Sequence, residues 1–518
     1  MEQQNLVDMP AQPVQAAGSG VIPTEDKPLK LRLPDRQQSV FTTIHPEDLI
    51  PADHKARAIA QLVEKRFDTQ AFYAGVKTRE GEAGCAKLDP KMLVSILVYA
   101  YSEGIGSMRL VSRRMGHDPG LMWLSGLTEI SHTVLSDFRR EHQKGLEGVF
   151  VQLLAILDEA EIINLEEVTL DGMRVRAYAG VDTFRRKKTI EKRLEQARAT
   201  LKKLEAAGEQ EQSEQRRQVA QRRAAEAMKK RLEESEKQFE QAHRNLSEAE
   251  KEKTRISTSE PEARILRTSD GGFAPAHNVQ LVTDAKNKVI VNLEVTNSGQ
   301  DGEHLQSALE GVEQNLGRKP EQVLADAAYM TQSNLGVASQ SSVEMLGPLP
   351  DNRKQEAAGL NKRGIDPALG RDAFVWDPDQ KVFRCPEGKA LTHQGYHSKD
   401  RDRKYDVYRA AVEDCTQCPR RAQCVGQDAA RVLQVQQKNP LVAAHAAKMA
   451  SEPAQTTYKK RGAVAEFPHA WIKEKIGLRK FHLSGLTKAT IEAMWACLTY
   501  NVMIWRRLVW LPELKPAT

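Results

Sequence analysis

A carboxylate follows each of two short apolar runs, and this repeated arrangement constrains the chain more than any other feature. The first run, in EEVTLDGMRV, ends at Asp171, and the second, in EQVLADAAYM, ends at Asp326. Each run has the length and composition of a buried strand, and a small residue follows each aspartate. A charge at such a place is costly unless it is paired or holds a metal ion. We therefore take Asp171 and Asp326 as the first candidates for catalysis.

The composition indicates a helix-rich, highly charged protein of several domains. The 518 residues suffice for roughly three or four domains of about 150 residues each. The net charge of +6 makes nucleic acid a candidate partner. No apolar run is long enough to cross a membrane, and the N-terminus lacks the basic and apolar regions of a signal peptide. We expect a cytoplasmic protein whose six cysteines are kept reduced.

The first 165 residues divide into a polar arm and a helical domain. Residues 1–34 are rich in Pro, Gln and Gly, which indicates a disordered arm. Residues 35–165 hold short apolar helices separated by glycine turns. The last of these helices carries Arg139 and Arg140, so the segment is similar to a helix-turn-helix bundle whose arginines contact DNA. A plain helical domain with a solvated basic face is the alternative.

A strongly charged segment interrupts the strand-rich part of the chain. Residues 184–255 contain 21 basic and 14 acidic residues. Apolar side chains recur there at gaps of three and four, which is typical of a coiled coil. The expected seam comprises Ile190, Leu194, Ala197, Leu201 and Leu204 on one arm and Met228, Leu232, Ser235, Phe239, Ala242, Leu246 and Ala249 on the other. We expect the chain to reverse near Gly208. The charged surface is either merely solvated or serves DNA binding or self-association.

The segments on either side of this insert predict an α/β domain. Residues 166–183 and 256–350 contain a strand with Asp171, a β-hairpin beginning near His277, a helix, and a strand with Asp326. The two aspartates could therefore lie on neighbouring strands of one mixed sheet. Residues 456–518 are helical, and their apolar last helix is suited to docking on this core.

A third carboxylate comes from YKKRGAVAEFPHAWIK, which contains Tyr458, Arg461, Glu466 and Lys473. Two strand-end aspartates and a helical glutamate can hold two Mg²⁺ ions about 4 Å apart, which activate a nucleophile and stabilise the leaving oxygen in phosphoryl transfer. Such hard cations prefer oxygen ligands. Arg461 and Lys473 would lie close to DNA phosphates. Glu466 therefore completes a candidate metal site.

These motifs together resemble the DDE transposases of bacterial insertion sequences, in particular a subgroup with a helical N-terminal domain and a Tyr-Arg-Glu-Lys signature. The matching stretches, which span roughly residues 38–510, are TLDGMRVRA, STSEPEARILRTSDGGFAPAHNVQLVTD, VLADAAY, YKKRGAVAEFPHAWIK and GLRKFHLSGLTKATIEA. The resemblance implies a ribonuclease H-like core in which Asp171, Asp326 and Glu466 bind Mg²⁺ or Mn²⁺. It also implies cleavage of double-stranded DNA at transposon ends, strand transfer into target DNA, and a homodimer in the DNA complex, in the bacterial cytoplasm near the nucleoid.

The chain departs from the commonest form of the signature in two places. Four residues, rather than three, separate Arg461 from Glu466. FPHAW stands where relatives often have a phenylalanine-glycine pair, which makes His469 a candidate for a DNA or catalytic contact. Two alternative functions stay open: a catalytically silent DNA-binding protein derived from such an element, and a metal-dependent nuclease that cuts without joining.

Four of the six cysteines lie in one cysteine-rich segment, residues 351–455. Cys385, Cys415, Cys418 and Cys424 have the pattern C-x29-C-x2-C-x5-C, which predicts a structural zinc site. Free buried thiols or redox-labile cysteines are the alternatives. The resemblance favours zinc, because related transposases have a similar cysteine set between the second aspartate and the glutamate. Cys85 and Cys497 are expected to be ordinary apolar residues.

Overall fold

A computed structural model describes residues 45–514 apart from 75, 77–86, 207–211, 244–247, 269, 352, 399–403 and 438. Residues Met1–His45 form one unit and Pro46–Thr518 form a second. The expected disordered arm, Cys85 and the expected reversal at Gly208 lie outside the described residues. Among the described helices, none has the length and apolar character needed to span a membrane.

Short helices build the first part of the second unit. Several begin at a side chain that accepts a backbone N–H: Asp89 accepts from Lys91, Asp118 accepts from Leu121, and proline follows each aspartate at the first helical position. The helices are η1 (Pro46–Asp48), α1 (Lys55–Lys65), η2 (Gln70–Tyr73), α2 (Pro90–Ser102), α3 (Met108–Arg114), α4 (Pro119–Leu124), α5 (His132–Glu141) and α6 (Gln143–Glu159). In the described residues, an all-helical region therefore precedes the first strand, as the sequence predicts.

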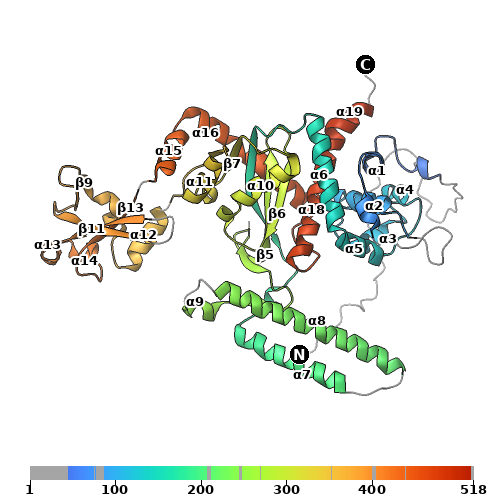
Figure 1. Ribbon diagram of the computed structural model, residues 1–518, viewed down its shortest axis with the longest axis horizontal. Helices are drawn as coiled ribbons and strands as arrows, with labels where there is room; N and C mark the ends of the chain where they lie inside the picture. The colour runs from blue at the N-terminus through green and yellow to red at the C-terminus, as the bar shows by residue number, and fades with distance from the viewer. Residues whose placement is uncertain are drawn as a thin grey trace, which may run out of the picture. The chain divides into compact units, whose positions relative to one another are not determined.

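A six-stranded mixed sheet forms the centre of this unit (Figure 1). Its order is β4-β5-β1-β7-β8, and β6 pairs with β5. β1 is parallel to β7, and β7 to β8, whereas β5 is antiparallel to β1, β4 and β6. The strands are β1 (Glu167–Arg176), β4 (Arg264–Arg267), β5 (Phe273–Asp284), β6 (Ile290–Thr296), β7 (Gln322–Ala325) and β8 (Glu344–Leu346). The predicted mixed α/β core is thus confirmed.

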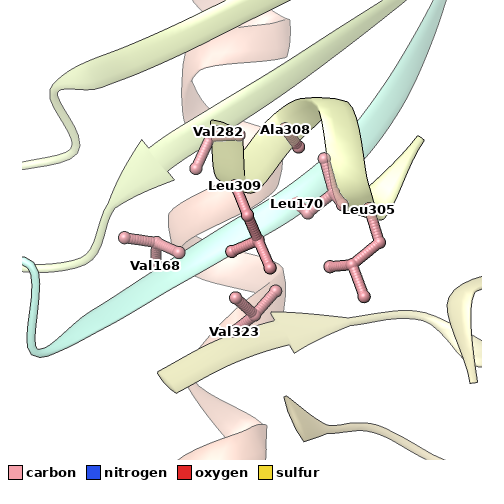
Figure 2. Close-up of a pocket in the computed structure, with 7 residues that line it drawn as sticks. All are labelled: Val168, Leu170, Val282, Leu305, Ala308, Leu309 and Val323. Carbon is pink, nitrogen blue, oxygen red and sulfur yellow. The ribbon is translucent and has the colours of Figure 1, made fainter. Parts of the chain in front are cut away.

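Helices pack on this sheet, and alternate residues of β1 point to opposite faces. Val168 and Leu170 of β1 pack beneath α10 (Leu305–Leu316), where a pocket is lined only by aliphatic side chains (Figure 2). Such a lining offers no polar group to a ligand, so the space belongs to the core. α18 (Leu486–Trp505) is buried nearly all round, and its Asn501 exchanges hydrogen bonds with the backbone of Ile290 in β6.

The charged insert is a pair of helices, α7 (Lys187–Ala206) and α8 (Gln212–His243), followed by α9 (Glu248–Lys253). Its base is closed by β2 (Phe184–Arg185), which pairs antiparallel with β3 (Ile256–Ser257). Members of the predicted seam form its core: Ile190, Leu194, Ala197, Leu232 and Phe239. Met228 is 40% exposed, so its predicted place in the seam was wrong. Among the side chains that the structure describes here, this apolar cluster lies in the half nearer the base, where Ser235 donates to Ser257 O.

The cysteine-rich segment forms a second, five-stranded antiparallel sheet with its own apolar core. Its strands are β9 (Val375–Asp377), β10 (Val382–Arg384), β11 (Ala390–Ser398), β12 (Lys404–Ala410) and β13 (Val432–Gln436), with helices α12 (Arg353–Lys362), α13 (Val412–Thr416) and α14 (Arg421–Cys424). The predicted boundary at residue 455 places α15 (Pro440–Met449) in this segment as well. That helix instead packs on the central sheet, since His445 hydrogen-bonds Gly347 O at 2.8 Å and Lys448 pairs with Glu344.

Candidate active site

The parallel pairing of β1 and β7 places the two aspartates at the same level. Leu170 lies opposite Ala325, and Asp171 and Asp326 follow these two residues on adjacent strands. Asp326 caps the 3-10 helix η5 (Ala327–Tyr329), because its carboxylate accepts the Ala328 N–H at 2.9 Å. β1 continues beyond Asp171 to Arg176 because β5 pairs with it along that length, so Asp171 lies within the strand rather than at its end.

Helix α17 (Arg461–Glu474) brings the third acid and two basic groups to this level of the sheet. The Arg461 Nη2 lies 3.1 Å from Asp171 Oδ1, and both side chains are about four-fifths buried. His469 Nδ1 lies 3.8 Å from Asp171 Oδ2, which is too long for a hydrogen bond. Glu466 is exposed, and its negative charge reaches Asp171. The structure thus brings together the acids that the sequence singled out.

Burial and mutual repulsion act on both aspartates. The pKa of Asp171 is raised above its usual range chiefly by burial, and the charges of Asp301 and Glu466 add to that rise, although Arg461 opposes it. The pKa of Asp326 is raised in the same way, by burial and by the charges of Asp171 and Asp301. The ionised cluster is therefore short of positive charge, which is the condition that favours cation binding.

The basic side chains on α17 differ in their charge state. Burial, followed by the charges of Lys473 and Arg461, lowers the pKa of His469 to about 4, so the imidazole is neutral at neutral pH. Its buried Nε2 has no hydrogen-bond partner among the residues with described side chains. Burial, followed by the charge of Arg479, lowers the pKa of Lys473. Tyr458, on α16 (Glu452–Lys459), interacts with Arg461, whose charge opposes the rise that burial causes in the tyrosine pKa.

Asp301 belongs to this site, and sequence reasoning missed it. From the sequence, Asp301 is interpreted as a turn or surface residue, as are Asp270, Asp284 and Glu262. Its carboxylate lies against Gly172, the residue after Asp171, and its charge acts on both site aspartates. The available signal was its position in NSGQDGEH, shortly after an apolar run, as with Asp326.

Arg139 does not form part of an exposed DNA-binding face, so that prediction was wrong. Its side chain is 4% exposed, and its guanidinium donates to Tyr101 Oη and Gly106 O and lies 3.8 Å from the fully buried Glu492. The helix that carries it is amphipathic, and Arg139 lies on the inner side. Arg140 is partly exposed and pairs with Asp137. Only Arg140 of the two remains available to DNA.

Neither predicted metal site is preformed in the structure. Within the described part of the chain, no group of three or more His, Cys, Asp or Glu side chains is placed to hold a metal ion. At the acidic site, Arg461 lies against Asp171, but the oxygen donors and their shortage of positive charge fit a hard divalent cation. Burial raises the pKa of Cys424, and the charges of Cys415, Cys385 and Cys418 add to the rise. Cys385 and Cys424 pack against the apolar core of the second sheet, which includes Cys415. Zinc binding by these thiols stays a prediction.

The raised pKa of Asp171 predicts that this residue destabilises the metal-free protein. A carboxyl group whose pKa is higher in the folded chain than in the unfolded chain stabilises the folded state at pH values below its unfolded pKa. This stabilisation is lost as the pH rises through the folded pKa. At neutral pH the ionised Asp171 therefore costs free energy. We expect Asp171→Asn to raise the unfolding free energy by on the order of 1 kcal/mol without metal. Chemical denaturation at pH 7.5 with EDTA measures this; a lower stability than wild type would contradict it.

Two family profiles match parts of the chain. Residues 384–504 match a family described as "Transposase DDE domain", and residues 44–141 match "Transposase domain (DUF772)". No curated protein matches. A solved structure titled "Cryo-EM structure of piggyBac transposase synaptic complex with hairpin DNA (SNHP)" is 9% identical over 89% of this chain and 77% of that chain, with a TM-score of 0.30, which is too low to establish a shared fold. Both matching families are transposase domains, and one of them is the DDE domain, which supports a DDE-type transposase.

Proposed function

We propose that the protein binds the ends of a mobile DNA element, cleaves them in a metal-dependent reaction, and transfers the cut strands to target DNA. The observation that supports this most is the convergence of Asp171, Asp326 and Glu466 around Arg461. We further propose that the central mixed sheet is a ribonuclease H-like core and that the element is a bacterial insertion sequence. The protein would then act in the cytoplasm, at the nucleoid.

Asp171, Asp326 and Glu466 would hold Mg²⁺, or Mn²⁺ in its place. A bound pair of such ions activates the attacking oxygen and stabilises the leaving oxygen. Arg461 balances part of the charge of Asp171 while the cluster is without cation. His469 is neutral and buried beside Asp171, so it adds no competing positive charge there.

The DNA-contacting groups that we propose lie around the acids. Lys473 follows Glu466 by seven residues on α17, and Tyr458 lies in the last turn of α16 beside Arg461. Lys473 can contact phosphate, and Tyr458 combines a ring with a hydroxyl donor. Arg140, which is half-exposed on α5, is a candidate in the helical region. Strand transfer requires these contacts to hold the reacting phosphate in line with the attacking oxygen.

The helical insert is a candidate for assembly of a homodimer on two DNA ends. Because β2 and β3 pair at its base, residues 187–253 can be replaced by a short glycine-serine turn without displacing the core. We expect this deletion to reduce paired-end complexes by about a hundredfold, through loss of avidity, and to leave Mn²⁺ binding unchanged. Native gels with one labelled end and one unlabelled end measure the pairing. Equal losses of pairing and of Mn²⁺ binding would contradict this assignment.

The zinc site is proposed as a stabilising feature of the second sheet. Metal content of the purified protein, measured beside a Cys415→Ser, Cys418→Ser variant, tests it. We expect about one zinc ion per chain in wild type and loss of this zinc in the variant.

Labelled DNA that carries the element's terminal repeats tests the main proposal. We expect the wild-type chain to nick this DNA with Mg²⁺ or Mn²⁺ and to lose this activity in EDTA. When target DNA is added, we expect joined products. Nicked products that are never joined would favour a nuclease. Binding without cleavage in either metal would favour a silent DNA-binding protein.

A further inference from the structure

A chain of hydrogen-bonded side chains connects the strand that carries Asp171 to the turn that carries Asp326. Gln280 of β5 lies opposite Gly172 in the antiparallel register. The Gln280 Oε1 accepts a hydrogen bond from the Tyr329 hydroxyl, and its Nε2 donates to Asp301 Oδ1 at 2.7 Å. Tyr329 is the last residue of η5, the short helix that Asp326 caps. We call Asp301, Gln280 and Tyr329 the polar clamp.

Asp301 accepts hydrogen bonds from three side chains around the polar clamp. Its two oxygens each accept a hydrogen bond of 3.0 Å from Arg174, and Oδ1 also accepts from Asn278 at 2.8 Å and from Gln280. Burial acts to raise the pKa of Asp301, but the Arg174 guanidinium and the amide donors outweigh burial and hold it below its usual range. Because its acceptor sites are occupied, Asp301 is suited to fixing its neighbours rather than to binding a cation.

Close backbone packing leaves the clamp little freedom. A Cβ at Gly172 would lie 2.5 Å from Asp301 Oδ1 and 2.6 Å from Gln280 Nε2. A Cβ at Gly302 would lie 2.4 Å from the Ala328 carbonyl of η5. Glycine at both positions therefore lets η4 (Asp301–Glu303) touch β1 and η5 directly.

A second set of hydrogen bonds links η4 to η5. Asn334, in α11 (Gln332–Gln340), donates from Nδ2 to Gly302 O and to Tyr329 O, each at 2.8 Å. The position of η5 is thus fixed relative to η4, and η4 is fixed relative to β1 through Asp301. Tyr329 itself is fully buried, so its hydroxyl cannot take water in place of Gln280.

We propose that Gln280 and Tyr329 are positioning residues, which set the spacing between Asp171 and Asp326 and thereby the affinity of the site for divalent cations. The inference rests on the proposed function of these acids. Outer-shell hydrogen bonds of this kind commonly change metal affinity or activity by about 10- to 100-fold. Neither Gln280 nor Tyr329 contacts the cation or the DNA in this scheme, so affinity for DNA should not depend on them.

The test compares Tyr329→Phe with wild type in two readouts, Mn²⁺ binding by electron paramagnetic resonance and the Mg²⁺ dependence of DNA cleavage. We expect the metal concentration for half-maximal effect to rise about tenfold in both, while the maximal rate and the DNA affinity stay near wild type. Tyr99→Phe is the matched control. Tyr99 is also a buried tyrosine, and its hydroxyl donates to Asp118 at 3.0 Å in the helical region. The control should keep the wild-type metal dependence.

A double-variant cycle separates positioning from general loss of stability. Gln280→Leu breaks both links of the chain, so Tyr329→Phe should have little further effect on Mn²⁺ affinity in that background. Wild-type metal dependence in Tyr329→Phe, or additive effects in the double variant, would overturn the proposal while the proposed function stands. A wild-type chain that binds no Mn²⁺ and cuts no DNA would overturn both.

Discussion

Asp171→Asn, Asp326→Asn and Glu466→Gln are each expected to lower the rate of DNA cleavage by about a thousandfold or more. Each substitution keeps the size of the side chain and removes one negatively charged ligand. Metal ions contribute several kcal/mol to stabilising phosphoryl-transfer transition states, and about 4 kcal/mol corresponds to a thousandfold in rate. Single-turnover cleavage of labelled end DNA measures the loss.

The three variants need controls for folding and for DNA binding. Glu474→Gln provides a matched control, because Glu474 also lies on α17 but pairs with the exposed Arg479. It should cleave at nearly the wild-type rate. All four variants should bind end DNA as wild type does. A variant of the trio that cleaves within tenfold of wild type would show that its carboxylate has another role.

Arg139→Met is expected to lower the stability of the protein far more than the same substitution at the adjacent Arg140. It removes the cation beside Glu492, which is fully buried, and leaves that carboxylate with the backbone N–H groups of His482 and Leu483 and the His482 ring. Removing one partner of a buried ion pair typically costs about 3–5 kcal/mol. Denaturant unfolding, followed by circular dichroism, measures the change.

Arg140→Met is the neighbouring control, since Arg140 is half-exposed, pairs with Asp137 and donates to Ser136 O, both within its own helix. We expect its unfolding free energy to change by less than about 1 kcal/mol. If Arg139 is structural, folded Arg139→Met should keep its DNA affinity, whereas Arg140→Met should bind DNA more weakly. A stable Arg139→Met variant with selectively lost DNA binding would instead support the DNA contact that the sequence predicts for Arg139.

The sequence was sufficient to locate the strands and the acids because these have local signals. Apolar runs followed by Asp171 and Asp326 indicated buried strands, and the mixed sheet confirms that interpretation. The heptad spacing of Ile190 and Leu194 indicated a helical pair, and both residues are buried in its core. Apolar residues repeat every two positions in a strand and about every three and a half positions in a packed helix. Backbone geometry sets both periods, so they can be recognised without a structure.

Other features depend on contacts between distant residues and could not be predicted. Arg139 and Arg140 are adjacent in the sequence, and only the packing of α5 against Glu492 of α18 decides which of them is buried. Asp301 is held at the site by hydrogen bonds from Arg174 and Gln280. Arg174 lies more than a hundred residues away in the sequence, and Gln280 lies about twenty residues away. The limits of the α7–α8 seam were missed because Met228 fits the heptad pattern yet is exposed.

The most direct measurement is a titration of Mn²⁺ into the protein bound to end DNA, for wild type and for Asp171→Asn with Asp326→Asn combined. We propose that these two aspartates form one cation site with Glu466. We therefore expect wild type to bind Mn²⁺ and the double variant to lose that binding, while the DNA complex stays intact. Equal Mn²⁺ binding by both proteins would refute the shared cation site, because the ion would then be held elsewhere.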